Sequence, residues 1–249
     1  MANGTRTRNL YDPSSTGSYK LSRSKLEMFL RCPRCFYLDR RLGISQPSMP
    51  AFSLNNAVDA LLKREFDSYR RRGEAHPLMM KFGIEAVPMQ HPSLEEWRDN
   101  RRGVRYEDPD SHFLFFGAVD DIWLNSDGEV HVVDYKSTST EGSVSLDGQW
   151  KEGYKRQVEM YQWLLRANDL PMSNTAFFFY VNADKGKESF GGKLEFSTVI
   201  LPHDGDDSWV KEALHEARLC LERESLPPSH PECEWCMYRG AAGEWEKEE

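Results

Sequence analysis

Two strand-like segments joined by a tight turn constrain the fold of this chain more than any other feature. Residues 112–124 (HFLFFGAVDDIWL) and 129–137 (EVHVVDYKS) are rich in β-branched and aromatic side chains, and the intervening NSDG is typical of a hairpin turn. A three-residue turn places Asp120 directly opposite Asp134, whereas a two-residue turn shifts this pairing by one position. In the first register, the two carboxylates share one otherwise apolar face, with Cβ atoms about 5 Å apart.

A carboxylate pair in this position needs a compensating charge. Like charges at this distance repel one another, and burial removes their hydration. Lys136 lies on the same face as Asp134 and supplies one positive charge, whereas a divalent metal ion supplies two and suits carboxylate oxygens. The simpler alternative is a salt bridge between Asp134 and Lys136 at a strand end, with Asp120 in a turn. Spacing alone leaves both interpretations open.

The rest of the chain predicts a mixed α/β domain. The pattern indicates helices at 21–33, 53–72, 150–168 and 207–225, a short helix near 93–100 within a loop-rich stretch, and strands at 175–183 and 193–201. From this order we expect a single domain over residues 21–240, with a polar tail over 1–20 and an acidic tail over 241–249.

Composition narrows the class of protein. Of the 249 residues, 39% are apolar and 29% charged, which is typical of a soluble globular chain, and no apolar run approaches the roughly 20 residues that span a bilayer. Five cysteines without an export signal indicate a reducing, cytoplasmic compartment. The net charge of −8 argues against a generic nucleic-acid binder. Basic side chains nevertheless cluster at 20–41, 70–72 and 98–105, where each cluster alone reads as a solvated face.

Four of the cysteines form two C-x-x-C pairs. Cys32 and Cys35 lie near the start of the chain, and Cys233 and Cys236 near its end. Two such pairs can hold one metal centre, because each dithiol loop spans one edge of a tetrahedron, and spacing alone makes zinc the first choice. Cys220 lies between leucines on an amphipathic helix and is expected to be a packing residue.

Several motifs together resemble those of one enzyme family. GAVDD, VVDYKST and YKRQVEMYQWLL follow one another in the order of the PD-(D/E)XK nuclease superfamily, with a closer likeness to its RecB-like branch, which includes the CRISPR-associated exonucleases and the AddB helicase–nuclease subunit. LSRSKLEMFLRCPRCFYLDRRLGI is similar to the opening of those nucleases, so the likeness extends from about Leu21 to Arg239. It implies a restriction-endonuclease-like mixed sheet flanked by helices, and a magnesium- or manganese-dependent DNA exonuclease.

The resemblance also implies roles for individual residues. Asp120 and Asp134 match the metal ligands, Lys136 matches the catalytic lysine, and the Tyr135 carbonyl would be a further ligand. Gln157 and Tyr161 match a Gln-x-x-x-Tyr element that packs by the site and contacts DNA; being four residues apart, they share one helix face.

The third protein ligand departs from the family pattern. Where the family has a glycine and then a histidine, this chain has Asn55 and Asp59. An oxygen ligand in place of an imidazole favours harder cations such as magnesium or manganese. Glu65 is a rival to Asp59 because it lies nearer the centre of the helix's apolar stripe; its simpler explanation is a salt bridge to an arginine.

The resemblance shifts the expectation for the cysteines. Several RecB-like nucleases hold a 4Fe-4S cluster with one early and three late cysteines. Cys32 matches the early ligand and Cys233 and Cys236 two of the late ones; the last is missing here, and Cys35 would have to replace it in space. We therefore expect a cluster joining the N- and C-terminal segments, with zinc as the alternative.

Three functional hypotheses follow. The first is a nuclease acting on DNA, with single-stranded ends as substrate, basic clusters along the phosphate backbone, and a helicase or CRISPR-adaptation protein as partner. Aromatic residues near 138–150, such as Trp150 and Tyr154, would stack on bases. The second is a non-catalytic nucleic-acid-binding adaptor in a repair or CRISPR-adaptation complex. The third is a zinc or redox protein whose carboxylate pair is structural.

Overall fold

The computed structural model describes residues 5–47 and 53–246, and the chain divides into two compact units. One unit comprises Met1–Pro50, Tyr106–Phe116 and Trp209–Glu249, and the other Ala51–Arg105 and Gly117–Ser208. The sequence predicted one domain between two tails. Residues 1–4 and 247–249 of those tails lie outside the described residues, and Tyr11 and Tyr19 of the expected N-terminal tail are buried.

A five-stranded mixed sheet forms the centre of the second unit. Only β6 and β7 pair in parallel; the other neighbouring strands are antiparallel. The strand order is β2 (Ala86–Pro88), β5 (Asp121–Asn125), β6 (Val130–Thr138), β7 (Thr175–Ala183) and β8 (Phe196–Asp204).

The hairpin of β5 and β6 has the three-residue-turn register, one of the two that the sequence left open. Leu124 pairs with Val130, and the Asn125 N–H donates to the Glu129 carbonyl at 3.0 Å. Continued by one residue beyond the strand, this register places Asp120 opposite Asp134. This register is favoured because a slip of one residue would turn every apolar side chain to the other face.

The predicted strand over 112–124 is instead two strands in different sheets. β4 (Phe113–Gly117) ends before Ala118, and β5 begins at Asp121. The backbone of Gly103 passes so close to Gly117 that a Cβ on Gly103 would lie 2.5 Å from the Gly117 carbonyl oxygen, and Gly103 has a φ of +62°. A side chain is excluded there, and the interruption leaves Asp120 at the open end of β5.

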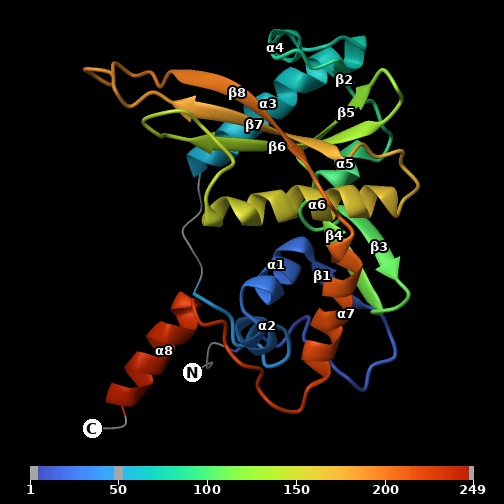
Figure 1. Ribbon diagram of the computed structural model, residues 1–249, viewed down its shortest axis with the longest axis vertical. Helices are drawn as coiled ribbons and strands as arrows, with labels where there is room; N and C mark the ends of the chain where they lie inside the picture. Colours follow the sequence, from blue (N-terminus) through green and yellow to red (C-terminus); the bar gives the residue numbers. More distant parts are fainter. Residues whose placement is uncertain (1–4, 48–52, 247–249) are drawn as a thin grey trace. The chain divides into compact units, whose positions relative to one another are not determined.

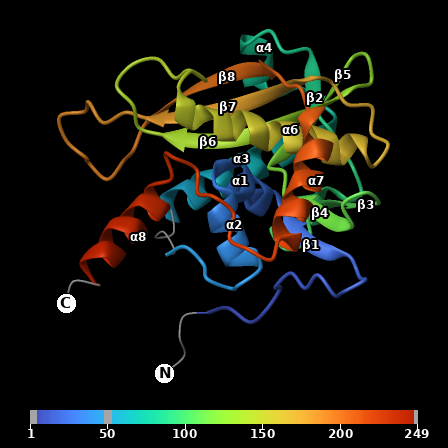
Figure 2. The ribbon, with the colours of Figure 1, turned by 60° about the horizontal axis from the view of Figure 1, so that its bottom comes forward.

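Helices α3 (Ser53–Arg72) and α6 (Glu152–Arg166, preceded by the 3-10 turn Gln149–Lys151) cover opposite faces of this sheet (Figures 1 and 2). Phe66 of α3 packs on Trp123 and Tyr135, whereas Asp134 binds Gln157 of α6. Because neighbouring residues of a strand point to opposite faces, the Asp134–Tyr135 sequence sends a carboxylate toward one helix and a ring toward the other.

The first unit contains mainly helices. α1 (Arg23–Arg31) and α2 (Pro33–Arg40) pack against α7 (Trp209–Glu222), and β1 (Tyr19–Ser22) pairs in parallel with β4 in a three-stranded sheet of order β1-β4-β3. The helices predicted over 21–33 and 207–225 are confirmed. The sequence missed α8 (Glu234–Trp245), together with α2, β1, β2, β3 (Val104–Asp108) and α4 (Pro77–Lys81); α5 (Leu94–Trp97) matches the short helix predicted near 93–100.

Candidate active site and cysteine centre

Asp134 is the most buried acid of the candidate active site. Its side chain is fully buried near the middle of β6, where Oδ2 forms an ion pair with Lys136 and Oδ1 accepts a hydrogen bond from Gln157 Nε2 at 2.7 Å. The same Gln157 nitrogen donates to the Tyr161 hydroxyl at 3.3 Å. Four residues singled out in the sequence therefore lie together on the α6 side of the sheet.

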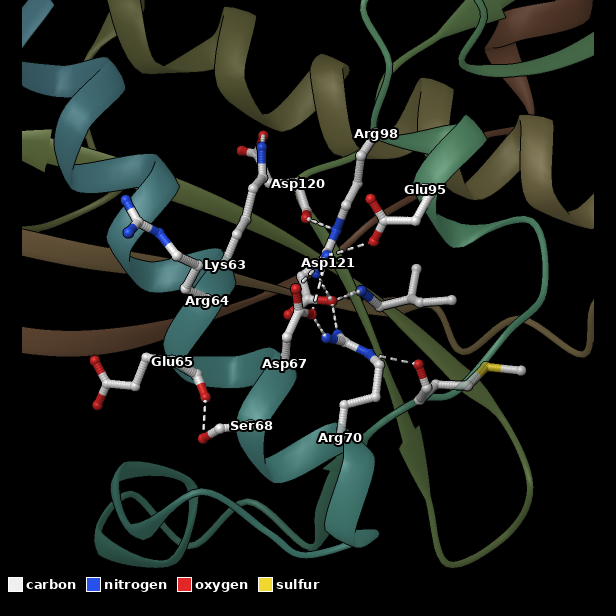
Figure 3. Close-up of polar contacts among 12 residues, drawn as sticks. Lys63, Arg64, Glu65, Asp67, Ser68, Arg70, Glu95, Arg98, Asp120 and Asp121 are labelled. Atoms are coloured by element: carbon white, nitrogen blue, oxygen red, sulfur yellow. Dashed lines mark hydrogen bonds and ion pairs between the residues drawn. The ribbon is translucent and has the colours of Figure 1, made fainter.

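Asp120 joins this group at the open end of β5. Its Oδ2 accepts from the Tyr135 N–H at 3.0 Å, and its Oδ1 lies 3.2 Å from the Lys63 ammonium. Arg98 Nε donates to the Asp120 backbone carbonyl at 3.0 Å. Backbone and side chain of Asp120 are thus both held (Figure 3).

Lys63 is the site residue that sequence reasoning missed. Its ammonium lies 2.9 Å from Asp59 Oδ2 as well as 3.2 Å from Asp120 Oδ1, and so joins two carboxylates from distant parts of the chain. The only signal in the sequence was the i, i+4 spacing of Asp59 and Lys63, which is also the spacing of an ordinary surface ion pair.

The three acids do not converge as one compact ligand set. Asp59 and Asp120 share the Lys63 ammonium, whereas Asp134 pairs with Lys136. We asked where three or more metal-ligating side chains have all their ligand atoms within 4.8 Å of one another. Among residues 5–47 and 53–246, the cysteines meet this criterion and the three acids do not.

The two lysines of the site are held in their charged form. Burial lowers the pKa of Lys136, but the carboxylates of Asp134 and Asp120 outweigh burial and raise this pKa above its usual value. The pKa of Lys63 is raised in the same way, against burial, by Asp120 and Asp59. Burial raises the pKa of Asp59, with Lys63 opposing and Asp120 adding to the shift.

A buried ion-pair network supports Asp120 and Tyr135 from the α3 side. Asp121 is fully buried, pairs with Arg70, and accepts from Arg98 at 3.1 Å and from the Tyr135 hydroxyl at 2.6 Å. Asp67 pairs with both arginines (Figure 3). Arg70 and Arg98 belong to clusters that the nuclease hypothesis assigned to the phosphate backbone; their burial against acids removes them from that role.

Glu65 lies apart from the other acids. Its carboxylate is 2.9 Å from His76 Nε2, more than half of its side chain is exposed, and it points away from Asp120 and Asp121 (Figure 3). The sequence suggested an arginine as its ion-pair partner; the partner is His76. This placement leaves Asp59, through Lys63, as the α3 acid connected to Asp120.

Aromatic side chains, one of them exposed, lie near Lys136, the candidate catalytic lysine. Trp150 is 67% exposed, with Lys151 Nζ 4.1 Å from its ring centroid and Tyr154 in an edge-to-face contact at 5.8 Å. Lys136 Nζ lies 4.7 Å from the Tyr154 ring centroid. Burial, followed by the charge of Lys136, lowers the pKa of Lys151.

The cysteine quartet, Cys32, Cys35, Cys233 and Cys236, lies in the first unit. Sγ–Sγ distances are 3.8 Å for Cys32–Cys236, 3.5 Å for Cys35–Cys233 and 3.6 Å for Cys35–Cys236. Cys220 lies outside the quartet, with its sulfur 3.8 Å from the Pro33 carbonyl oxygen, as expected for a packing residue.

Cys32 and Cys233 occupy the N-cap positions of α2 and α8, and their partners lie three residues on, in the first turns. Burial raises the pKa of the Cys32 thiol, but hydrogen bonds from the backbone N–H groups of Cys35 and His230 outweigh burial, and this pKa is about 7. Burial raises the pKa of the Cys35 and Cys236 thiols, that of Cys236 to about 11, so Cys32 is the thiol of the quartet with a lowered pKa.

Of the comparisons with known proteins, the family model identifies a family. The model of the PD-(D/E)XK nuclease superfamily matches residues 20–241. The crystal structure of SSO0001 is similar with a TM-score of 0.47 and 16% sequence identity, over 89% of this chain and 84% of that one. No curated protein matches. Among the described residues, no helix has the length and apolarity needed to cross a membrane.

Proposed function

The chain belongs to the PD-(D/E)XK nuclease superfamily, and we propose that it is a metal-dependent DNA nuclease that degrades DNA from its ends, within the RecB-like branch. The observation that carries this proposal is the fully buried Asp134, held by Lys136 and Gln157 next to the end of β5 where Asp120 lies. Burying a carboxylate with a lysine costs desolvation free energy and adds little to stability. Buried ionisable groups of this kind are common at functional sites, which favours a functional role here.

Asp59, Asp120, Asp134 and the Tyr135 carbonyl are the residues that would hold magnesium or manganese. Carboxylate oxygens suit both ions, and the Lys63 ammonium between Asp59 and Asp120 marks a position that already accommodates a cation. A bound ion lowers the pKa of a water molecule and polarises the phosphate.

The side chains of the chain itself supply charge and orientation. Because its pKa is raised, Lys136 stays protonated near neutral pH and is suited to offset the negative charge that builds on the phosphoryl oxygens, rather than to accept a proton. Gln157 fixes the Asp134 carboxylate, and Asp121 with Arg98 fixes the strand end that carries Asp120.

We assign recognition of single-stranded ends to Trp150 and Tyr154. Base–aromatic stacking is tolerant of sequence, as an exonuclease requires. Trp150 offers an exposed ring beside the Lys151 ammonium, and the Tyr154 ring lies beside the Lys136 ammonium. The residues assigned here bind and cut a strand but do not separate the strands of a duplex. For duplex substrates we therefore expect a helicase or a CRISPR-adaptation protein as partner.

One observation favours a second function. Lys63 and Lys136 together already compensate the acids of the site, as they would in a non-catalytic adaptor that binds nucleic acid without a metal ion. Such an adaptor would bind DNA with the same affinity whether or not magnesium is present and would not cut it.

The test is degradation of end-labelled single- and double-stranded DNA by wild type, Asp120→Ala and the control Asp127→Ala, whose side chain lies exposed in the β5–β6 turn. The nuclease proposal expects products from wild type and Asp127→Ala, with a ladder that shortens from one end, and none from Asp120→Ala. Cleavage by Asp120→Ala would overturn the assigned site. Binding without cleavage by wild type, under either metal, would establish the adaptor.

A further inference from the structure

The cysteine quartet is a second centre that the nuclease chemistry does not use. The resemblance to RecB-like nucleases implies a 4Fe-4S cluster here, so the fit of that group can be tested against the positions of the four sulfur atoms. Three Sγ–Sγ distances are 3.5, 3.6 and 3.8 Å, and all four sulfur atoms lie within 4.8 Å of one another.

These distances match four ligands on a single ion. Sulfur atoms about 2.3 Å from one zinc ion lie about 3.8 Å apart at the corners of a tetrahedron. In a 4Fe-4S cluster each thiolate binds a different iron, and the iron and sulfide atoms separate the thiolates from one another. Sulfur atoms in van der Waals contact leave no space for that body of eight atoms.

From this geometry we propose that Cys32, Cys35, Cys233 and Cys236 bind one tetrahedral Zn²⁺ ion in place of the cluster. The pairing of ligands supports this assignment: two early and two late cysteines form two equivalent C-x-x-C loops, in contrast to the one-plus-three pattern that the resemblance to RecB-like nucleases implies.

Both loops present the ion with the same local structure. Each begins at a helix N-cap and places its second sulfur in the first helical turn, so the dipoles of α2 and α8 both favour thiolates. The backbone N–H of His230 also points at the Cys32 sulfur, at 3.5 Å. Thiolates stabilised in this way are the ligands that zinc requires.

The ion has a structural task in this position. None of the residues of α8 is buried, so packing contributes little to holding this helix, whereas Cys32 and Cys35 are almost fully buried on the α1–α2 side. Zinc would therefore fasten α8 to the N-terminal helices of the same unit. A d¹⁰ ion adds no redox chemistry to the centre.

The test is metal and sulfide analysis of full-length protein purified without oxygen from cells supplied with both iron and zinc. Wild type and Cys220→Ser should carry about one zinc per chain, without iron or acid-labile sulfide, and should lack broad visible absorption. Cys35→Ser and Cys236→Ser should each lose the zinc. Titration of metal-free wild type with Co²⁺ should give the absorption of a tetrahedral thiolate site, a result that does not depend on the folding of any variant.

A second measurement addresses the structural task. Removal of zinc by a strong chelator should increase hydrogen exchange over Glu234–Trp245 and leave exchange over β6 unchanged. Iron in the anaerobic protein, with or without sulfide, would overturn the proposal, as would a folded chain without bound metal, or zinc that survives in Cys35→Ser and Cys236→Ser.

Discussion

The acids around β5 and β6 and the cysteine quartet are two potential metal centres. They differ in whether cationic side chains of the protein already compensate the charge of the ligands. Asp120, Asp121 and Asp134 each have an ammonium or guanidinium group of the chain beside them. The four thiols lie against one another and accept hydrogen bonds from the backbone. We therefore expect the first centre to fold before a metal ion arrives, whereas the proposed zinc ion would be needed to hold α8.

The difference also explains why one ion would be labile and the other permanent. At the acid site, metal binding must displace Lys63 from Asp59 and Asp120, which reduces the net gain. At the quartet, the ion replaces thiol protons, and the hydrogen bonds of the described sulfur atoms join them to one another and to the His230 N–H rather than to a side-chain cation. The following experiments are ordered from the largest expected effect to the smallest.

Asp121→Ala should have the largest effect on folding. It leaves Arg70 and Arg98 as buried guanidinium groups with one acid fewer, and breaking a buried ion pair in this way costs about 3–5 kcal/mol. Urea unfolding should show that loss in the free energy of unfolding, with Asp127→Ala close to wild type. A loss below about 1 kcal/mol would mean that the acid site is not supported by this network.

Lys136→Ala should slow DNA cleavage by about 10²–10³-fold, the usual cost of removing one charge-stabilising group from a transition state. Because Lys136 is assigned to the chemical step, DNA affinity should change far less than the rate. Single-turnover cleavage and a filter-binding titration measure the two quantities, with the exposed Lys193→Ala as control. Equal losses in rate and affinity would assign Lys136 to binding.

Asp39 is a buried carboxylate of the first unit whose charge is also compensated by neighbouring cationic side chains. Burial raises its pKa, but hydrogen bonds from Arg40, Lys25 and Ser45 lower it to about 2. Since this pKa lies below the unfolded value of about 3.9, the stabilisation is present above that pH and is lost as pH falls toward 2.

Asp39→Asn should therefore lower the free energy of unfolding by about 2.5 kcal/mol at pH 7, since each pKa unit is worth about 1.4 kcal/mol, and by progressively less as the pH approaches 2. Thermal unfolding between pH 2 and 7 measures this, against Asp169→Asn, whose side chain is exposed. A deficit that does not shrink at low pH would exclude the ion pairs as its cause.

Trp150→Ala should weaken binding of a single-stranded oligonucleotide by roughly 1–3 kcal/mol, the value of one stacked base. Fluorescence anisotropy of labelled DNA gives the affinity. Trp245→Ala removes a similarly exposed ring from α8 and serves as the matched control. The same loss in both variants would show a nonspecific contribution of exposed aromatic surface.

Lys63→Met should increase the affinity for Mn²⁺ by about tenfold, equivalent to 1.4 kcal/mol, because the competing ammonium is gone. In metal-free solution the same variant should melt at a lower temperature, since Asp59 and Asp120 lose their shared cation. Titration calorimetry and thermal unfolding with and without Mn²⁺ measure both effects, with exposed Lys81→Met as control. Weaker Mn²⁺ binding would instead make Lys63 part of the metal site.

The sequence predicted those features that depend on local periodicity. The side-chain alternation reduced the β5–β6 pairing to two registers, of which the structure has one, and four-residue spacing put Gln157 and Tyr161 on one face of α6. Two C-x-x-C pairs were sufficient to anticipate the cysteine quartet, since few other arrangements place four thiols at such spacing.

The sequence did not predict the features that depend on tertiary packing. Residues 112–124 are a largely apolar run in which Gly117 is the one sign of a break, and the close approach of Gly103 to Gly117, where they divide into two strands, is a tertiary contact. Arg70 and Arg98 look like solvated charges in sequence because their acid partner, Asp121, is distant along the chain. α8 carries no buried face from which periodicity could predict a helix.

Dependence of DNA cleavage on a removable divalent ion tests the central claim most directly. Wild-type protein dialysed against EDTA should leave end-labelled single-stranded DNA intact, and addition of Mg²⁺ or Mn²⁺ should restore cleavage fully. Cleavage that continues in excess EDTA, or DNA that remains intact with either ion present, would contradict a metal-dependent nuclease centre at Asp120, Asp134 and Lys136.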